Sequence, residues 1–177
     1  IHLKKFKNIF MKNFKVVVAL VMSIAAISCS SDDDNNNTSN NVMSIAGEES
    51  DISAAGIENY GENADGSYDW DVYLFGDGIT INNSTPVGQG AYIYLDLNTN
   101  NVDGLVVGTY TYADDRAPFT WVYADACRSF NTSNFNCASG NYSASAGTVV
   151  ISGSGNNTQI EVTTVPADGS GASITAS

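Results

Sequence analysis

The sequence predicts an all-β fold, a single antiparallel β-sandwich or barrel-like domain that follows a signal peptide and a disordered tether. Three observations predict it. Apolar and polar residues alternate with a period of two in several short segments, clusters of Gly, Asn, Asp and Ser separate these segments, and no stretch after residue 44 shows a helical period. We place this domain at residues 44–177, which is long enough to bury one hydrophobic core.

Seven short segments carry the strand pattern. Residues 68–75 and 91–97 alternate most regularly, so each is expected to bury one face and to leave the other polar. The other predicted strands are residues 78–82, 108–113, 119–124, 147–152 and 158–165. Trp70 and Trp121 share their faces with apolar residues, which favours core packing over ligand binding for both side chains.

The segment before the domain has the features of a secretory signal. Residues 11–15 include two lysines and residues 16–28 carry no charge, and this run is shorter than the roughly 20 apolar residues that a membrane span needs. We therefore interpret residues 11–28 as a signal peptide and residues 1–10 as untranslated upstream sequence. Residues 29–43 are rich in acidic and amide side chains and are expected to form a flexible tether.

The residues around Cys29 resemble a bacterial lipoprotein signal. Ala26-Ile27-Ser28-Cys29 is similar to the lipobox, in which small residues precede a lipidated cysteine, although Ile27 stands where a small residue is more common. An ordinary signal peptide with an incidental cysteine is the alternative. Residues 30–34, Ser-Ser-Asp-Asp-Asp, resemble the acidic export signal of surface-exposed lipoproteins of Bacteroidota. The resemblance implies that Cys29 carries lipid and that the domain faces the cell exterior from the outer membrane.

The distribution of charge excludes several classes of partner and reaction. All lysines and the single histidine precede Cys29, whereas all 19 acidic residues follow it, so two arginines against 19 acids leave a formal charge of −17 from residue 29 onward. Such a surface repels phosphate backbones, which excludes nucleic acid as a partner. Membrane attachment is then assigned to the lipid and not to a basic patch. Without Lys or His, Ser-His-Asp and Schiff-base catalysis cannot be assembled.

Cys127 and Cys137 remain after Cys29 is assigned to the lipid. In an exported protein two such cysteines are expected to form a disulfide, which would staple the loop between them. A metal-binding thiol pair is the rival interpretation, but no histidine or further cysteine is present to complete that site.

The order of motifs from residue 60 onward resembles a family of small all-β lipoproteins of Bacteroidota. An aromatic-rich strand is followed by Gly-Thr-Tyr-Thr-Tyr at 108–112, Gly-Thr-Val-Val-Ile at 147–151, Gln-Ile-Glu-Val at 159–162 and then Ala-Asp-Gly before a final strand. The resemblance implies a fold and a location but no reaction. Because the final strand continues in that family, we expect that this chain is truncated at Ser177 and that a sheet edge is left open there.

Carboxylates are the remaining candidates for catalysis. Asp69 and Asp71 lie on one face of a predicted strand, at a spacing that a glycoside hydrolase could use. Alternation alone, however, predicts polar residues on that face. We therefore expect that the protein is not an enzyme, and a carboxylate-based hydrolase stays the least favoured interpretation. Asp114 and Asp115 are expected to pair with the neighbouring Arg116.

Residues 96–104 raise the question of calcium. Side-chain oxygens recur there as in the first half of a calcium-binding loop, at Asp96, Asn98, Asn100 and Asp103. Asn101 and Val107 stand where the EF-hand pattern needs Gly and Glu. We favour an ordinary Asx-rich hairpin loop and keep calcium as the alternative. No other cofactor is predicted.

The nine tyrosines supply the binding hypothesis. Alternation favours an exposed set, consisting of Tyr73, Tyr92, Tyr94, Tyr110 and Tyr112. Aromatic rings that line one face can bind the flat faces of sugars. We therefore expect a non-catalytic ligand-binding module, with glycans as the leading ligand class. The alternative is a structural or accessory subunit that packs against an outer-membrane protein partner.

Overall fold

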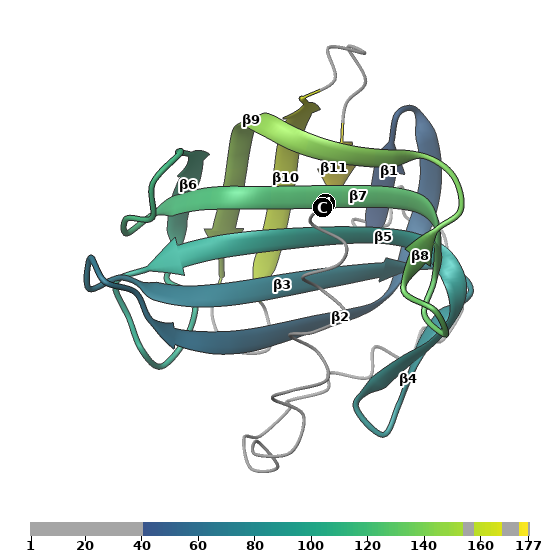
Figure 1. Ribbon diagram of the computed structural model, residues 1–177, viewed down its shortest axis with the longest axis horizontal. Helices are drawn as coiled ribbons and strands as arrows, with labels where there is room; N and C mark the ends of the chain where they lie inside the picture. Colours follow the sequence, from purple (N-terminus) through teal and green to yellow (C-terminus); the bar gives the residue numbers. More distant parts are fainter. Residues whose placement is uncertain (1–40, 154–157, 168–173, 177) are drawn as a thin grey trace, which may run out of the picture. The chain divides into compact units, whose positions relative to one another are not determined.

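The computed structural model describes residues 41–153, 158–167 and 174–176. Over these residues the chain forms β-strands and connecting turns (Figure 1). No helix in the described ranges has the length and apolar character of a membrane span. The expectations for the signal peptide, for Cys29 and for most of the tether lie outside the described residues.

All seven predicted strands are present, and the described residues form further strands that sequence reasoning missed. The strands are β1 (Val42–Ile45), β2 (Glu48–Glu62), β3 (Tyr68–Gly76), β4 (Ile79–Asn82), β5 (Thr85–Thr99), β6 (Gly108–Tyr112), β7 (Thr120–Asn131), β8 (Asn136–Cys137), β9 (Asn141–Ser152), β10 (Gln159–Pro166) and β11 (Ile174–Ala176). Because β1 begins at Val42 and Met43 is fully buried, the folded domain starts slightly before the expected boundary at residue 44.

The sheet closes on itself, so the barrel-like alternative of the predicted fold is the one observed. Hydrogen bonds join the strands in the order β4-β5-β3-β2-β1-β11-β10-β9-β6-β7-β8, and the additional β5–β7 and β9–β7 pairings complete the ring. The pairings between described strands are antiparallel except for the short β6–β7 contact. In Figure 1, β2, β3, β5 and β7 run side by side across the near face, and β1, β10 and β11 lie behind them.

The main hydrophobic core lies inside this ring. Val72 and Leu74 of β3 stand opposite Leu95 and Ile93 of β5, and these inward positions alternate with outward ones along each strand. Residues from β1, β6, β7, β9, β10 and β11 complete the same buried cluster. Trp70 and Trp121 are 6% and 0% exposed, which confirms that both pack in the interior.

A second cluster covers the outward face of β3, β5 and β7. Phe75 and Tyr92 stand opposite each other there, and Cys127 of β7 is buried beside them. Cys127 forms a disulfide with Cys137 of β8, which confirms the predicted pairing and closes the turn between these two strands.

Strand β2 has a long stretch of open edge. It pairs with β3 from Ile52 to Glu62, but it pairs with β1 only from Glu48 to Asp51. The final strand β11, in contrast, lies between β1 and β10. The expectation of an open edge at the final strand is therefore wrong, because β11 is paired on both sides. Within the described ranges, residues 53–62 of β2 are a long stretch that is paired on one side only, and the short strands β4 and β8 also have a single neighbour each.

Candidate functional site

Three carboxylates meet on the outward face of β3 and β5, and we call them the acidic cluster: Asp69, Asp71 and Asp96. Asp69 and Asp71 belong to β3, and Asp71 stands directly opposite Asp96 of β5. One carboxylate oxygen from each residue lies within 4.8 Å of the others. The Asp-Trp-Asp sequence places two acids on one face of a strand, and antiparallel pairing brings the third against them.

Arg116, in the loop between β6 and β7, neutralises part of this charge. Its Nη1 lies 2.8 Å from Asp69 Oδ2, and its two nitrogens donate to the two oxygens of Asp96 at 2.8 and 2.6 Å. This bidentate contact is the strongest geometry that a guanidinium and a carboxylate can adopt. The expectation that Arg116 pairs with Asp114 and Asp115 is wrong, because its guanidinium reaches the acidic cluster instead.

Asp71 is bound by two phenol groups. Tyr73 donates its hydroxyl to Oδ2 at 3.0 Å, and Tyr94 donates to Oδ1 at 2.8 Å. Asp71 is only 6% exposed, and this burial raises the pKa of its carboxyl to about 7, with smaller increases from the charges of Asp96 and Asp69. The hydrogen bonds from the tyrosines oppose the increase.

The pKa of Asp96 is also raised, but its neighbours differ from those of Asp71. Burial raises the pKa of its carboxyl, the charge of Asp69 raises it further, and the guanidinium of Arg116 opposes both effects. Two neighbouring acids therefore gain protons more readily than ordinary aspartates do.

Asp69 has one oxygen that no other described group binds. Its Oδ2 is held by Arg116, whereas its Oδ1 is buried without a hydrogen-bond partner. A buried acceptor without a donor costs free energy, and a donor from outside the described residues would relieve this cost.

A continuous row of rings borders the acidic cluster, and we call it the aromatic row. Neighbouring ring centroids lie between 4.5 and 6.4 Å apart in the order Phe130, Tyr92, Phe75, Tyr73, Tyr94 and Tyr123. The outward positions of β3, β5 and β7 supply all six rings. Tyr92 and Tyr94 are 8% and 7% exposed, so most of their surface is covered.

The structure brings together three of the five tyrosines predicted as an exposed set. Tyr73, Tyr92 and Tyr94 belong to the aromatic row, where Tyr73 is half-buried and Tyr92 and Tyr94 are buried. The expectation that Tyr92 and Tyr94 are exposed is therefore wrong, because neighbouring strands place bulky rings on both sides of them.

The other two predicted tyrosines lie on β6, away from this row. Tyr110 is fully buried, and its hydroxyl donates to the carbonyl oxygen of Val106 at 2.8 Å. Tyr112 packs against Trp121, with 4.9 Å between the ring centroids. Tyr110 is therefore a core residue, contrary to expectation, and Tyr112 is half-buried against the core.

The four calcium candidates divide between a strand and a turn. Asp96 and Asn98 lie within β5 and both accept hydrogen bonds from Arg116. Asn100 and Asp103 lie exposed in the connection after β5, where the backbone N–H of Asp103 donates to Asn101 Oδ1. The connection therefore has the geometry of an Asx turn. Calcium binding by these four residues stays a prediction.

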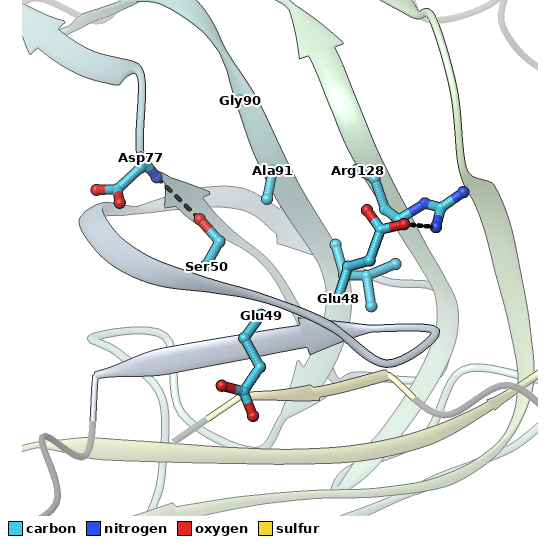
Figure 2. A pocket seen from close by; sticks show the side chains of 8 residues that line it. Glu48, Glu49, Ser50, Asp77, Gly90, Ala91 and Arg128 are labelled. Atoms are coloured by element: carbon cyan, nitrogen blue, oxygen red, sulfur yellow. Dashed lines mark hydrogen bonds and ion pairs between the residues drawn. The ribbon is translucent and has the colours of Figure 1, made fainter.

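A second polar site is a small pocket at one end of the sheet, beside the β1–β2 turn (Figure 2). Its volume is about 210 Å³, and its lining consists of Ile45, Glu48, Glu49, Ser50, Asp77, Gly90, Ala91 and Arg128. Figure 2 shows Arg128 paired with Glu48, and the N–H of Asp77 donating to Ser50 Oγ at 3.1 Å. Three acids against one arginine make the pocket negative.

Sequence reasoning found parts of the acidic cluster without its connections. The alternation placed Asp71 beside Tyr73 on one face, and Asp96 beside Tyr94 on another. Asp71 and Asp96 come together only because β3 pairs with β5. The alternation within one strand does not show which other strand it pairs with. Arg116 comes from a loop, for which periodicity carries no signal.

Comparisons with protein-family models, with curated proteins and with solved structures find no match for this chain. The resemblance to lipoproteins of Bacteroidota therefore stays a prediction from the motifs.

Proposed function

We propose that this protein is a non-catalytic β-module that binds glycans, held on the outer face of the outer membrane by a lipid on Cys29. The observation that carries the proposal is the placement of the acidic cluster and Arg116 beside the aromatic row on one sheet face. Carboxylate oxygens accept hydrogen bonds from sugar hydroxyls, and guanidinium groups donate to them. Aromatic rings pack against the apolar faces of sugars, and the half-buried rings of the row that keep surface for this contact are Tyr73, Tyr123 and Phe130.

A ligand would enter at the Asp69–Arg116 end of the site. The side chains of Arg116 and Asp69 are 34% and 16% exposed, whereas Asp71 and Asp96 are buried behind them. The buried acids then act as positioning groups, because they hold the guanidinium and the tyrosine hydroxyls in place.

The contacts within the cluster favour binding over catalysis. A glycoside hydrolase needs one carboxyl to protonate the leaving group and a second to attack the sugar or to activate water. Here Asp96 is held by a bidentate arginine and Asp71 by two tyrosine hydroxyls. These partners occupy the oxygens that an acid-base pair would use.

Binding of the purified protein to an array of plant and marine polysaccharides tests this function. We expect saturable binding that is at least tenfold weaker in Asp69→Asn and Arg116→Met, because both variants remove polar contacts at the accessible end. Arg128→Met, which changes an arginine outside the site, is the matched control and should bind as the unchanged protein does.

Three outcomes would contradict the proposal. Failure to bind any glycan would exclude glycans as ligands, and equal loss in Arg128→Met would show that the effect is not local. Release of reducing sugars by the unchanged protein would show that the site is catalytic.

Calcium-dependent binding that is lost in Asp103→Asn would assign a role to the connection after β5.

The proposed location has its own test. Incorporation of labelled fatty acid is expected in the unchanged protein and not in Cys29→Ala. Protease added to intact cells should degrade the anchored protein if it faces the exterior. A lipidated protein that resists protease until the cells are broken would place it on the inner side of the membrane.

A second candidate function is a structural or accessory subunit of an outer-membrane complex. The open stretch of β2 favours it, because an exposed strand edge is a template on which another chain can add a strand. Chemical crosslinking in whole cells, followed by purification of the protein, should then recover a defined outer-membrane partner. Recovery of the protein alone would contradict this candidate.

A further inference from the structure

The open stretch of β2 is both accessible and rich in side chains that could select a partner. Ile57 and Tyr60 are 49% and 40% exposed, and Glu58 and Glu62 are exposed as well. β3 pairs with this stretch on one side, and in the part of the chain that the structure describes no strand pairs with residues 53–62 on the other. Within the described residues, backbone N–H and C=O groups on that side have no strand partner and can pair with an incoming strand, although the N–H of Gly61 already donates to Asn59 Oδ1 at 2.7 Å.

The two faces of this stretch differ in chemistry. Ile57 stands opposite Val72, on the side that faces the core, whereas Glu58 stands opposite Asp71, on the outward side. Tyr60 shares the outward side with Glu58, to which its hydroxyl donates at 3.1 Å. A strand added here would therefore place alternate side chains against an apolar surface and against carboxylates.

The charge of the strand discriminates between partners. β2 carries five acidic residues and no basic one, namely Glu48, Glu49, Asp51, Glu58 and Glu62. Arg116 forms ion pairs with Asp69 and Asp96. Arg128 forms an ion pair with Glu48. A second copy of residues 29–177 would bring the same formal charge of −17 against this edge, which opposes self-association.

We propose that an extended basic segment of a partner protein adds as an antiparallel or parallel strand to residues 53–62 of β2. The inference rests on the accessory-subunit function and names the chemistry of its partner. Backbone hydrogen bonds provide the attachment, and alternating basic and apolar side chains match Glu58 on one face and Ile57 on the other. The acids exclude further copies of this chain from the edge without excluding a basic strand.

Hydrogen exchange of the full chain with three synthetic peptides tests the proposal. The peptides alternate Lys with Val, Glu with Val, or Lys with Pro over about ten residues, which matches the open stretch. The Lys-Pro peptide carries the same charge as the Lys-Val peptide but lacks half of the backbone donors. We expect the Lys-Val peptide alone to slow amide exchange within residues 53–62, and less so when salt rises from about 50 to about 500 mM.

Two charge-matched double variants locate the effect. Glu58→Lys with Glu62→Lys should weaken binding of the Lys-Val peptide by about tenfold or more and should favour the Glu-Val peptide. Asp115→Lys with Glu161→Lys makes the same change of charge at exposed positions away from the edge, and it should bind the Lys-Val peptide nearly as the unchanged protein does.

Several outcomes would overturn the proposal. In the exchange experiment, these are equal protection of the amides by the Glu-Val or Lys-Pro peptide, protection outside β2, or no protection by the Lys-Val peptide. In the variants, it is equal weakening of Lys-Val peptide binding by both double changes. Crosslinking in cells separates this failure from failure of the accessory function. A partner still recovered with Glu58→Lys and Glu62→Lys would keep the accessory function and exclude this edge as its site.

Discussion

Asp71 of β3 and Asp96 of β5 stand directly opposite each other on the outward face of the sheet. Like charges in opposed positions destabilise a strand pair, and burial increases the cost. The two acids are accommodated differently, since Arg116 binds Asp96 in a bidentate contact and two tyrosine hydroxyls bind Asp71. Burial raises the pKa of Asp71 to about 7, and no cation among its described hydrogen-bond partners opposes this increase.

The raised pKa of Asp71 predicts that stability falls as pH rises. The folded protein keeps the proton of Asp71 up to about pH 7, whereas an unfolded chain loses it near pH 3.8. Between these values the native state binds more protons, so the free energy of unfolding decreases with pH through this window. We expect Asp71→Asn to be more stable than the unchanged protein by about 1–2 kcal/mol above pH 7, with no gain near pH 4. Urea unfolding across this range measures it, and a gain that does not change with pH would contradict the assignment.

The two arginines are expected to contribute unequally to stability. Arg116→Met leaves Asp69 and the buried Asp96 without their cation, which should cost about 1–3 kcal/mol at pH 8, less than a fully buried pair because Arg116 is partly exposed. The cost should shrink toward pH 5, because burial raises the pKa of Asp96 to about 6 and its carboxylate is then protonated.

Arg128→Met provides the matched control for this comparison. Glu48 is 66% exposed, so its ion pair with Arg128 is expected to contribute about 0–1 kcal/mol. Methionine also keeps most of the apolar stem that packs beside Gly140. Thermal or urea unfolding that ranks Arg128→Met as the more damaging change would contradict the central role of Arg116.

Reduction of the Cys127–Cys137 disulfide should lower stability without abolishing the fold. The bond closes a short segment at the β7–β8 turn, and a loop of this size is expected to contribute about 2.5–3 kcal/mol in the chain-entropy account. Urea unfolding with and without reductant measures the difference. Identical transitions, with free thiols confirmed by mass spectrometry, would show that packing of Cys127 carries the stability of this turn.

Gly147 should tolerate no side chain. Its φ is +120°, and an added Cβ would lie 2.1 Å from the carbonyl oxygen of Thr163 in the neighbouring strand β10. Gly147→Ala is therefore expected to destabilise the protein by about 2–4 kcal/mol. Gly104→Ala is the control, because an added Cβ there meets no atom within 4 Å. Its effect should stay within about 0.5 kcal/mol.

The alternation of residues was sufficient to predict the fold class and most strands. One face of β3 and β5 packs against the core, so apolar residues alternate regularly in residues 68–75 and 91–97. β2 escaped prediction because its residues 53–62 lack a regular apolar alternation, and pairing with β3 holds this strand in place. β1 and β11 are short, and each is stabilised by the strands beside it.

The candidate site could be predicted only in pieces. Alternation shows which residues share a face, but it does not show whether that face is covered. Tyr92 and Tyr94 were therefore assigned to the correct face and to the wrong environment. The contact of Arg116 with Asp69 and Asp96 depends on how a loop folds across two strands, and neither spacing nor composition encodes that path.

The pairing of β1 with β11 constrains when the protein can finish folding. Met43 faces Ala176, so a strand near the start of the domain is completed by one near the end of this sequence. Contacts between such distant residues are slow to form, because a long loop must close before they are gained. Folding therefore cannot be completed before residues 174–176 have been synthesised. Until residues 174–176 arrive, β1 and β10 each lack a neighbour, and the half-formed sheet is most vulnerable to aggregation and proteolysis during this interval.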